Sequence, residues 1–285
     1  MSAPPAPALR CYMNWLALDG LREPAEGWFA ALRGADYDGV QFVQPLSRAP
    51  VEQSRACGLR VCGSGRVNHA GDAESLAAEA RDLGLECLTL HVGWGMEDDR
   101  DAAGLIDSVL EASARHRLPL YPETHRATLF QDLWRTVQFV RRFPELRFNG
   151  DFSHWYTGLE MVYGGFENKL EFIQPVLERV RFLHGRIGTP GCIQVDIGDG
   201  DSRERPYIEH FRALWTAAFS GFLRCAAPGD AICFAPELLA PGIYYARTFE
   251  GREESDRWRQ AQVLRGIARE CFQSALESSG AATGL

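Results

Sequence analysis

Four acid or imidazole side chains stand at the carboxyl ends of four successive strand-like segments, and this pattern constrains the fold most. The residues are Glu123 in LPLYPETH, Asp151 in LRFNGDFSH, His184 in VRFLHGRI and Glu237 in AICFAPEL. Each segment is short and apolar or β-branched, and is polar at its end, where α/β barrels place their chemistry. Side chains so far apart in sequence can meet only if the strands close on each other. The pattern therefore predicts one metal ion at the mouth of a parallel barrel.

Strand-like and helical segments alternate along most of the chain. Strands are expected at 10–15, 39–44, 59–63, 87–92, 118–123, 146–151, 180–186 and 231–237. Helices are expected at 23–33, 47–56, 73–83, 102–115, 129–142, 167–178, 206–223 and 253–276. Repeated strand-helix units are typical of parallel strands with crossover helices, and eight units favour closure. We expect a single-domain (β/α)8 TIM barrel over 9–278, with disordered tails at 1–8 and 279–285.

The composition fits this fold and excludes several classes of protein. A chain of 285 residues, 46% of them hydrophobic, is close to the size of one such barrel. Its net charge of -8 argues against a nucleic-acid partner, because phosphate backbones are bound through clustered Lys and Arg. The sequence has neither a leader-like N-terminus nor a membrane-spanning apolar run. We expect a cytoplasmic protein with free cysteines and a small-molecule partner, and we leave open whether it forms a homo-oligomer.

Three carboxylates and one imidazole form a hard, oxygen-rich set of ligands. This set suits Mn²⁺ first, with Mg²⁺, Fe²⁺ and Zn²⁺ as alternatives. Such an ion can chelate a hydroxyl and an adjacent carbonyl and stabilise the enediolate that forms when a neighbouring carbon loses a proton. We assign Glu123 and Glu237 as the acid and base of this transfer, in addition to ligation. Arg186 is expected to orient an anionic or hydroxyl-rich substrate, since a guanidinium can fork onto a carboxylate or phosphate.

The order Glu, Asp-x-x-His, His, Glu at successive strand ends resembles the sugar phosphate isomerase/epimerase family. These xylose-isomerase-like barrels include ketose 3-epimerases, inosose dehydratases and hydroxypyruvate isomerases, and the resemblance covers nearly the whole chain. It implies the metal ligands Glu123, Asp151, His184 and Glu237. It also implies that His154 contacts the substrate. The epimerases usually carry an Asp two residues after the metal-binding His, where this chain has Arg186, so the substrate stays open among sugars, keto-sugars and polyols.

Other residues near the expected mouth are candidates for contact with the substrate. His91, in LTLHVGWG, ends a strand, which fits a role beside the site and a structural role equally well. His69 is a similar but weaker candidate. Trp15 can stack on the face of a sugar, although core packing is the ordinary role of such a ring. His125 is expected to turn away from the pocket and to be structural.

The expected reaction is the isomerisation, epimerisation or proton-abstracting elimination of a sugar. The alternative is a metal-dependent abasic-site endonuclease of the same superfamily, which holds three metals. This chain keeps matches to several ligands of that centre, His69 and His91 among them. The Asp-x-His pair expected after His184 is missing, because the nearest candidate, Val195-Asp196-Ile-Gly198, lacks a histidine. The acidic net charge also weighs against DNA.

Overall fold

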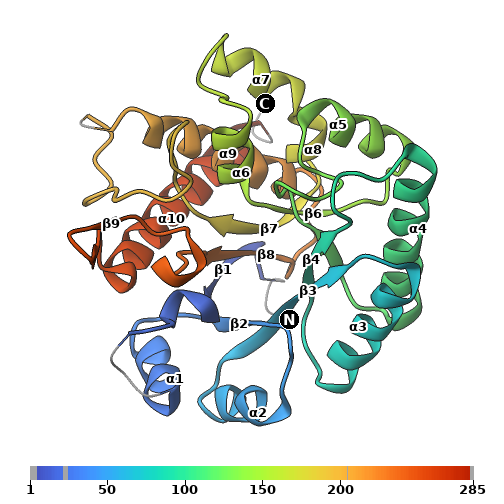
Figure 1. The fold of residues 1–285 in the computed structure, drawn as a ribbon, viewed down its shortest axis with the longest axis horizontal. Coiled ribbons are helices and arrows are strands. Elements are labelled where there is room, and N and C mark those ends of the chain that lie inside the picture. Colours follow the sequence, from blue (N-terminus) through green and yellow to red (C-terminus); the bar gives the residue numbers. More distant parts are fainter. Residues whose placement is uncertain (1–4, 22–24, 204, 283–285) are drawn as a thin grey trace.

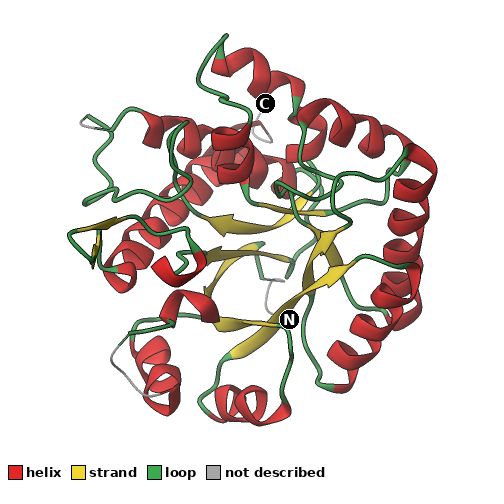
Figure 2. Cartoon of the chain, viewed as in Figure 1, coloured by secondary structure: helices red, strands yellow, loops and turns green. Residues whose placement is uncertain are grey.

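The computed structural model describes residues 5–21, 25–203 and 205–282 and shows a ring of strands surrounded by helices (Figures 1 and 2). The strands of this ring are β1 (Ala8–Asn14), β2 (Gly39–Val43), β3 (Arg60–Val67), β4 (Leu88–Val92), β5 (Leu120–Pro122), β6 (Phe148–Gly150), β7 (Val180–Gly185) and β8 (Ala231–Pro236). Their order in the sheet is β5-β4-β3-β2-β1-β8-β7-β6, and neighbours pair in parallel. The predicted (β/α)8 barrel is confirmed, and every predicted strand overlaps an observed one.

Helices follow the strands around the outside of the ring (Figure 1). They are α1 (Ala25–Gly34), α2 (Arg48–Ala56), α3 (Ala70–Asp82), α4 (Asp99–His116), α5 (Leu133–Arg142), α6 (Phe152–Gly158), α7 (Phe166–Phe172), α8 (Gln174–Leu177), α9 (Tyr207–Leu223) and α10 (Arg257–Ala282). Each predicted helix is observed, and the segment predicted at 167–178 is divided into α7 and α8. Helix α6 was not predicted. Asp151 caps it by accepting from Ser153 N at 3.0 Å.

The remaining short elements lie at the carboxyl ends of β1 and β8. They are the 3-10 helices η1 (Trp15–Leu18) and η2 (Pro241–Ile243) and the hairpin of β9 (Thr248–Phe249) with β10 (Arg252–Glu253). None of them was predicted from the sequence, because segments of two to four residues carry too little periodicity to be recognised.

The barrel closes between β5 and β6 through the segment that carries Glu123. Glu123 forms a parallel bridge with Asn149 of β6, and Thr124 N donates to Asn149 O at 3.1 Å. On the other side, Glu123 N donates to Leu90 O of β4 at 2.8 Å. The backbone around residue 123 is therefore held by both neighbouring strands, which fixes the direction of the Glu123 side chain.

Inside the barrel, an apolar layer lies beneath a polar one. The apolar layer is formed by Tyr12, Cys62, Cys87, Phe182, Cys233 and Ala235. Because side chains of a strand alternate between faces, the residue two positions further on points inward one level higher. Asn14, Thr89 and His184 follow Tyr12, Cys87 and Phe182 in this way, and all three are buried. The polar layer thus begins where the strands approach their carboxyl ends. The eight cysteines are free, as predicted.

The two ends of the chain correct the expected tails. Ala8 already belongs to β1, and Pro5 O accepts from Gly229 N at 2.7 Å. At the other end, positions 279–282 belong to α10. Positions 1–4 and 283–285 lie outside the described residues. Within the described part of the chain, no helix has the length and apolar character needed to cross a membrane.

Gly185 of β7 is expected to be required for packing against β8. A Cβ atom at this position would lie 2.1 Å from Cζ of the buried Phe234 ring. We expect Gly185→Ala to lower the free energy of unfolding by roughly 1–3 kcal/mol, because overpacking displaces the ring. Chemical denaturation measures this change. The control is Gly191→Ala, where a Cβ meets nothing within 4 Å, and an equal loss in both variants would contradict the explanation.

Candidate metal centre

The four residues predicted as metal ligands meet at the carboxyl ends of β5, β6, β7 and β8. One donor atom from each of Glu123, Asp151, His184 and Glu237 lies within 4.8 Å of every other. The first three residues are almost fully buried, and the Glu237 side chain is 12% exposed. The fold therefore brings the predicted ligands into one buried cluster, in which Glu237 is the most exposed.

His184 lies at the centre of this cluster. Its Nδ1 atom is 3.3 Å from Glu123 Oε2 and 3.4 Å from Glu237 Oε1. Its Nε2 atom is 2.9 Å from Gln41 Oε1, and the Gln41 amide is oriented because its Nε2 donates to Thr89 Oγ1 at 2.9 Å. A carbonyl oxygen can only accept, so His184 carries its proton on Nε2. Nδ1 then faces the carboxylates and can bind a metal ion once its own proton has left, which is the arrangement of a metal-binding histidine.

The two oxygens of the Glu123 carboxylate have different surroundings. Oε2 accepts from Asn149 Nδ2 at 2.9 Å and faces His184, whereas Oε1 is buried without a hydrogen-bond partner. Burial raises the pKa of Glu123, but the charges of His184 and His91 outweigh it and hold this pKa well below its usual range. A buried carboxylate with an unpaired oxygen is costly unless a cation is present. Glu123 thus fits a bound metal ion.

Arg186 lies inside the cluster and not at its mouth. The side chain is fully buried, its Nη2 atom bonds to Asp151 Oδ2, and the same atom is 3.0 Å from Glu237 Oε2. Nη2 is also 3.0 Å from His154 Nε2, and Nε donates to Ser153 Oγ at 3.0 Å. Nη1 is buried and has no partner among the described residues. Nη1 is therefore the guanidinium nitrogen that remains for the predicted contact with a substrate. The positive charge of Arg186 balances the neighbouring carboxylates of Asp151 and Glu237.

Asp151 is the most heavily hydrogen-bonded of the four predicted ligands. Its Oδ1 atom accepts from Ser153 N at 3.0 Å and from Ser153 Oγ at 2.5 Å, while Oδ2 accepts from Arg186. Burial raises the pKa of Asp151, but the Arg186 charge outweighs it and moves this pKa far below its usual range. Asp151 therefore stays ionised. With Arg186 in place, a divalent ion and a neutral His184 would balance the three carboxylate charges.

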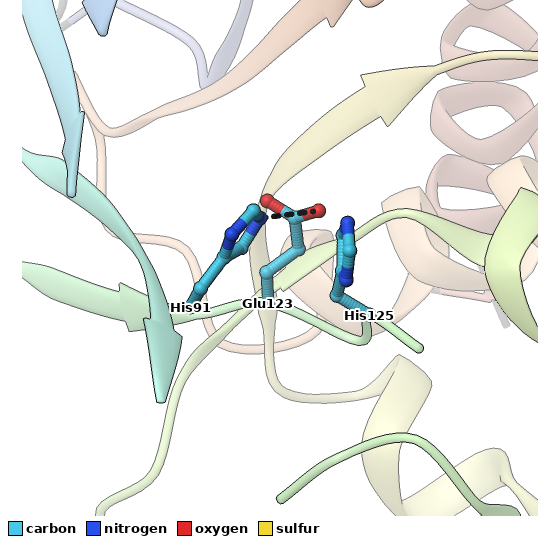
Figure 3. A group of neighbouring side chains, drawn as sticks. All are labelled: His91, Glu123 and His125. Atoms are coloured by element: carbon cyan, nitrogen blue, oxygen red, sulfur yellow. Dashed lines mark ion pairs between the residues drawn. The ribbon is translucent and has the colours of Figure 1, made fainter. Parts of the chain in front are cut away.

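A row of three imidazoles lies beside Glu123. The ring centroids of His91 and His125 are 4.1 Å apart, and those of His125 and His154 are 3.6 Å apart. Figure 3 shows the His91 and His125 rings beside the Glu123 side chain. The prediction that His125 turns away is wrong, because residues two positions apart on an extended chain share a face. Burial lowers the pKa of His125 to about 2, so its ring is neutral.

His91, Glu123 and His125 also form a group of potential ligand atoms, but His91 is oriented as a donor. Arg66 Nη2 lies 3.3 Å from His91 Nδ1, and a guanidinium can only donate. Nδ1 therefore accepts, and the nitrogen that carries a proton toward Glu123 is Nε2, which is 3.5 Å from Glu123 Oε1. His91 is placed to orient Glu123 and not to bind a metal.

The other predicted substrate contacts lie in different environments. His154 is buried between His125 and Arg186, as described above, and His154 Nδ1 has no partner among the described residues. The Trp15 ring packs on Phe29 at 5.1 Å, so core packing accounts for it. His69 is exposed at the start of α3. No described contact joins Trp15 or His69 to the carboxylate cluster, and their assignment to the substrate stays a prediction.

Comparison with known proteins supports the fold. No family model matches the sequence, and no curated protein matches it. A xylose isomerase-like TIM barrel protein from Mycobacterium smegmatis, in complex with magnesium, is similar with a TM-score of 0.55 and 16% identity, over 93% of this chain and 98% of that one. A xylose isomerase domain protein from Planctomyces limnophilus has a TM-score of 0.55 and 15% identity, over 96% and 99%. The fold is that of a xylose isomerase-like TIM barrel.

A further solved structure shares part of this barrel. A probable 3-DHS dehydratase from Bacillus anthracis has a TM-score of 0.50 and 15% identity, over 64% of this chain and 74% of that one. These identities are low, so the likeness establishes the arrangement of strands and helices. The fold that the resemblance implied is confirmed.

Metal binding is expected to release a proton from His184. Burial lowers the pKa of His184, but Glu237 and Glu123 outweigh it and raise this pKa from 6.5 to about 10. In the metal-free protein the ring is therefore protonated at about pH 7.5, and an ion bound at Nδ1 displaces that proton. We expect release of about one proton per ion. Isothermal titration calorimetry with Mn²⁺ in buffers of different ionisation enthalpy measures it.

The number of protons that His184 releases on metal binding depends on the pH. Because the pKa of His184 in the fold is raised to about 10, release is nearly complete well below pH 10 and declines as the pH rises through 10. The stabilisation that His184 gives the metal-free fold is fully present below its ordinary pKa of 6.5 and is lost as the pH rises from there through about 10. Stoichiometric binding without proton release at about pH 7.5 would contradict the assignment of His184 Nδ1 as a ligand.

Removing the Arg186 charge is expected to destabilise the metal-free protein. Arg186→Met leaves the buried Asp151 and Glu237 carboxylates without their guanidinium partner. Loss of one partner of a buried ion pair costs roughly 3–5 kcal/mol. Chemical denaturation with and without Mn²⁺ measures the change, and Mn²⁺ should restore part of the loss. Arg100→Met, at an exposed position, is the control, and a similarly small change in both variants would refute a charge-balancing role for Arg186.

Proposed function

We propose that this protein is a divalent-metal-dependent isomerase or epimerase that acts on a sugar, a keto-sugar or a related polyol. The observation that carries the proposal is the placement of Glu123 and Glu237, which reach His184 Nδ1 from β5 and from the end of β8 at 3.3 and 3.4 Å. Two carboxylates converging on one point can remove a proton from carbon and return it.

The cluster has the donor set for a divalent ion. Its ligands would be Glu123, Asp151, His184 and Glu237. The Oε1 atom of Glu123, which accepts no hydrogen bond, and the Nδ1 atom of His184, which faces the carboxylates, support this fit. Hard oxygen ligands favour Mn²⁺ or Mg²⁺ over softer metals. When bound, the ion supplies Lewis-acid stabilisation of negative charge on substrate oxygens.

Glu237 is the better placed of the two glutamates to take the proton. Its side chain is the most exposed of the four, so it lies nearest to an entering substrate. Asn14 Nδ2 donates to its Oε1 at 3.3 Å and Arg186 Nη2 is 3.0 Å from its Oε2, which holds the carboxylate in one orientation. Glu123 is positioned by Asn149 and faces the same space, where it can return the proton to carbon.

Aromatic and imidazole rings near the cluster suit a hydroxyl-rich substrate. Trp94 follows β4 and is 48% exposed, and His91 is partly exposed beside Glu123. Tyr245 lies 4.7 Å from Arg186 Cζ and 6.3 Å from the His154 ring. Rings of this kind can pack on the apolar face of a sugar and exclude water from the reacting carbons.

Exchange of carbon-bound hydrogen tests the proposal. We expect the Mn²⁺-loaded protein to introduce solvent deuterium into one or more members of a panel of ketoses and ketose phosphates, read by proton NMR. Glu237→Gln should lower the exchange rate by about 10²–10⁴-fold, because the catalytic base is lost. Glu209→Gln, at an exposed position of α9, is the matched control.

Two outcomes would count against the proposal. Turnover of a sugar without any exchange or cleavage at a carbon-bound hydrogen would exclude proton abstraction by Glu237. Incision of an abasic-site duplex that depends on His69 and His91, with no exchange in any sugar, would favour the endonuclease alternative.

A further inference from the structure

A groove lined by arginines crosses the amino-terminal ends of the later strands, at the opposite end of the barrel from the metal centre. A cavity of about 260 Å³ is lined by Arg147, Arg179, Arg181 and Arg224, together with Glu178 and Cys225. Two adjoining cavities, of about 400 and 200 Å³, share Arg181 with it. Arg147 directly precedes β6 and Arg179 directly precedes β7, which places the groove on the lower face.

The groove carries more positive charge than its acidic residues balance. Glu178 is the acidic residue that lines the first cavity, and it pairs with Arg224, whose Nη2 atom is 3.0 Å from Glu178 Oε1. In the described part of the chain, Arg147, Arg179 and Arg181 make no ion pair. Burial, followed by the charges of Arg147 and Arg179, lowers the pKa of Arg181, so these cations lie close enough to repel each other. An anion between them would offset that repulsion.

The adjoining acids do not change this balance. Glu145 and Asp230 line the second and third cavities. Neither forms an ion pair with an arginine among the described residues, and the Asp230 carboxylate accepts from Ala227 N at 2.8 Å. The positive charge in the centre of the groove therefore remains without an acidic partner from the described chain.

The guanidinium groups are held in place by main-chain carbonyls. The Nη1 atoms of Arg147, Arg179 and Arg181 donate to carbonyls at 2.6–3.1 Å. The carbonyls belong to Pro144, Leu146, Pro175, Glu178 and Val180. Arg179 Nε is buried and has no hydrogen-bond partner among the described residues. Arg181 is held further because its Nη2 atom donates to Cys225 Sγ at 2.8 Å. The remaining N–H groups, those of Arg147 and Arg179 above all, are available for an oxyanion that accepts from planar, forked donors.

We propose that this groove is a binding site for a small phosphate-bearing molecule, separate from the metal centre. Three arginines without acidic partners can neutralise one phosphoryl group, and a cavity of about 260 Å³ has room for it. Because the groove and the metal centre lie at opposite ends of the strands, the bound anion takes no part in the proton transfer. Binding of the anion stabilises the folded barrel.

Thermal unfolding and calorimetry of the full chain test this site. The probe is inorganic phosphate, compared with sodium chloride at equal ionic strength, and phenyl phosphate, which is not a sugar, is a second arm that distinguishes free phosphate from a phosphate ester. We expect phosphate or its ester to raise the Tm more than chloride does. Arg147→Gln and Arg179→Gln should each weaken phosphate binding by about tenfold or more, since a charge-assisted contact is lost.

The controls separate this site from general charge effects and from misfolding. Arg100→Gln removes a positive charge at the start of α4, away from the groove, and should leave phosphate binding unchanged. Circular dichroism identifies variants that keep the fold, and either groove variant suffices. Equal effects of phosphate and chloride, or unchanged phosphate binding in a folded groove variant, overturns the inference. These readouts do not depend on catalysis, so they are independent of the proposed function.

Discussion

The bridge between Glu123 and Asn149 joins the two edge strands of the sheet, and the candidate site depends on it. Strands β5 and β6 are only three residues long, so few other contacts can close the barrel there. The same two residues also bond through their side chains, with Asn149 Nδ2 donating to Glu123 Oε2 at 2.9 Å. Closure therefore places the predicted ligands that follow β5 and β6 beside those of β7 and β8. A substitution that breaks the contact between β5 and β6 would therefore disturb both the barrel and the candidate site.

Buried charge is the second constraint on this molecule. Three carboxylates packed together would repel each other, and Arg186 and His184 supply the opposite charge from within the protein. Arg186 is permanently charged, whereas His184 can exchange its proton for a metal ion. The cluster can thus be assembled before the ion arrives, because the protein itself already holds most of the balancing charge.

The four residues of the cluster were predictable from the sequence because a polar residue at the end of an apolar strand is a local signal. The helix α6 and the position of Arg186 were not. Arg186 shares the inward face of His184, but its partner Asp151 lies 35 residues away, and only closure brings them together. Gln41 and Asn149, which orient His184 and Glu123, were missed although each is a polar residue within an otherwise apolar strand. A polar residue inside an apolar strand is the sequence signal from which Gln41 and Asn149 could have been predicted.

The apolar layer of Tyr12, Cys62, Cys87, Phe182 and Cys233 gives the barrel a floor. Since these side chains fill the interior beneath the polar layer, the carboxylate cluster is closed off from the amino-terminal end of the barrel. Glu237, whose side chain is 12% exposed, lies at the carboxyl end. In the proposed enzyme a reactant and its product would therefore use the same side of the barrel, and each would have to leave before the next could bind.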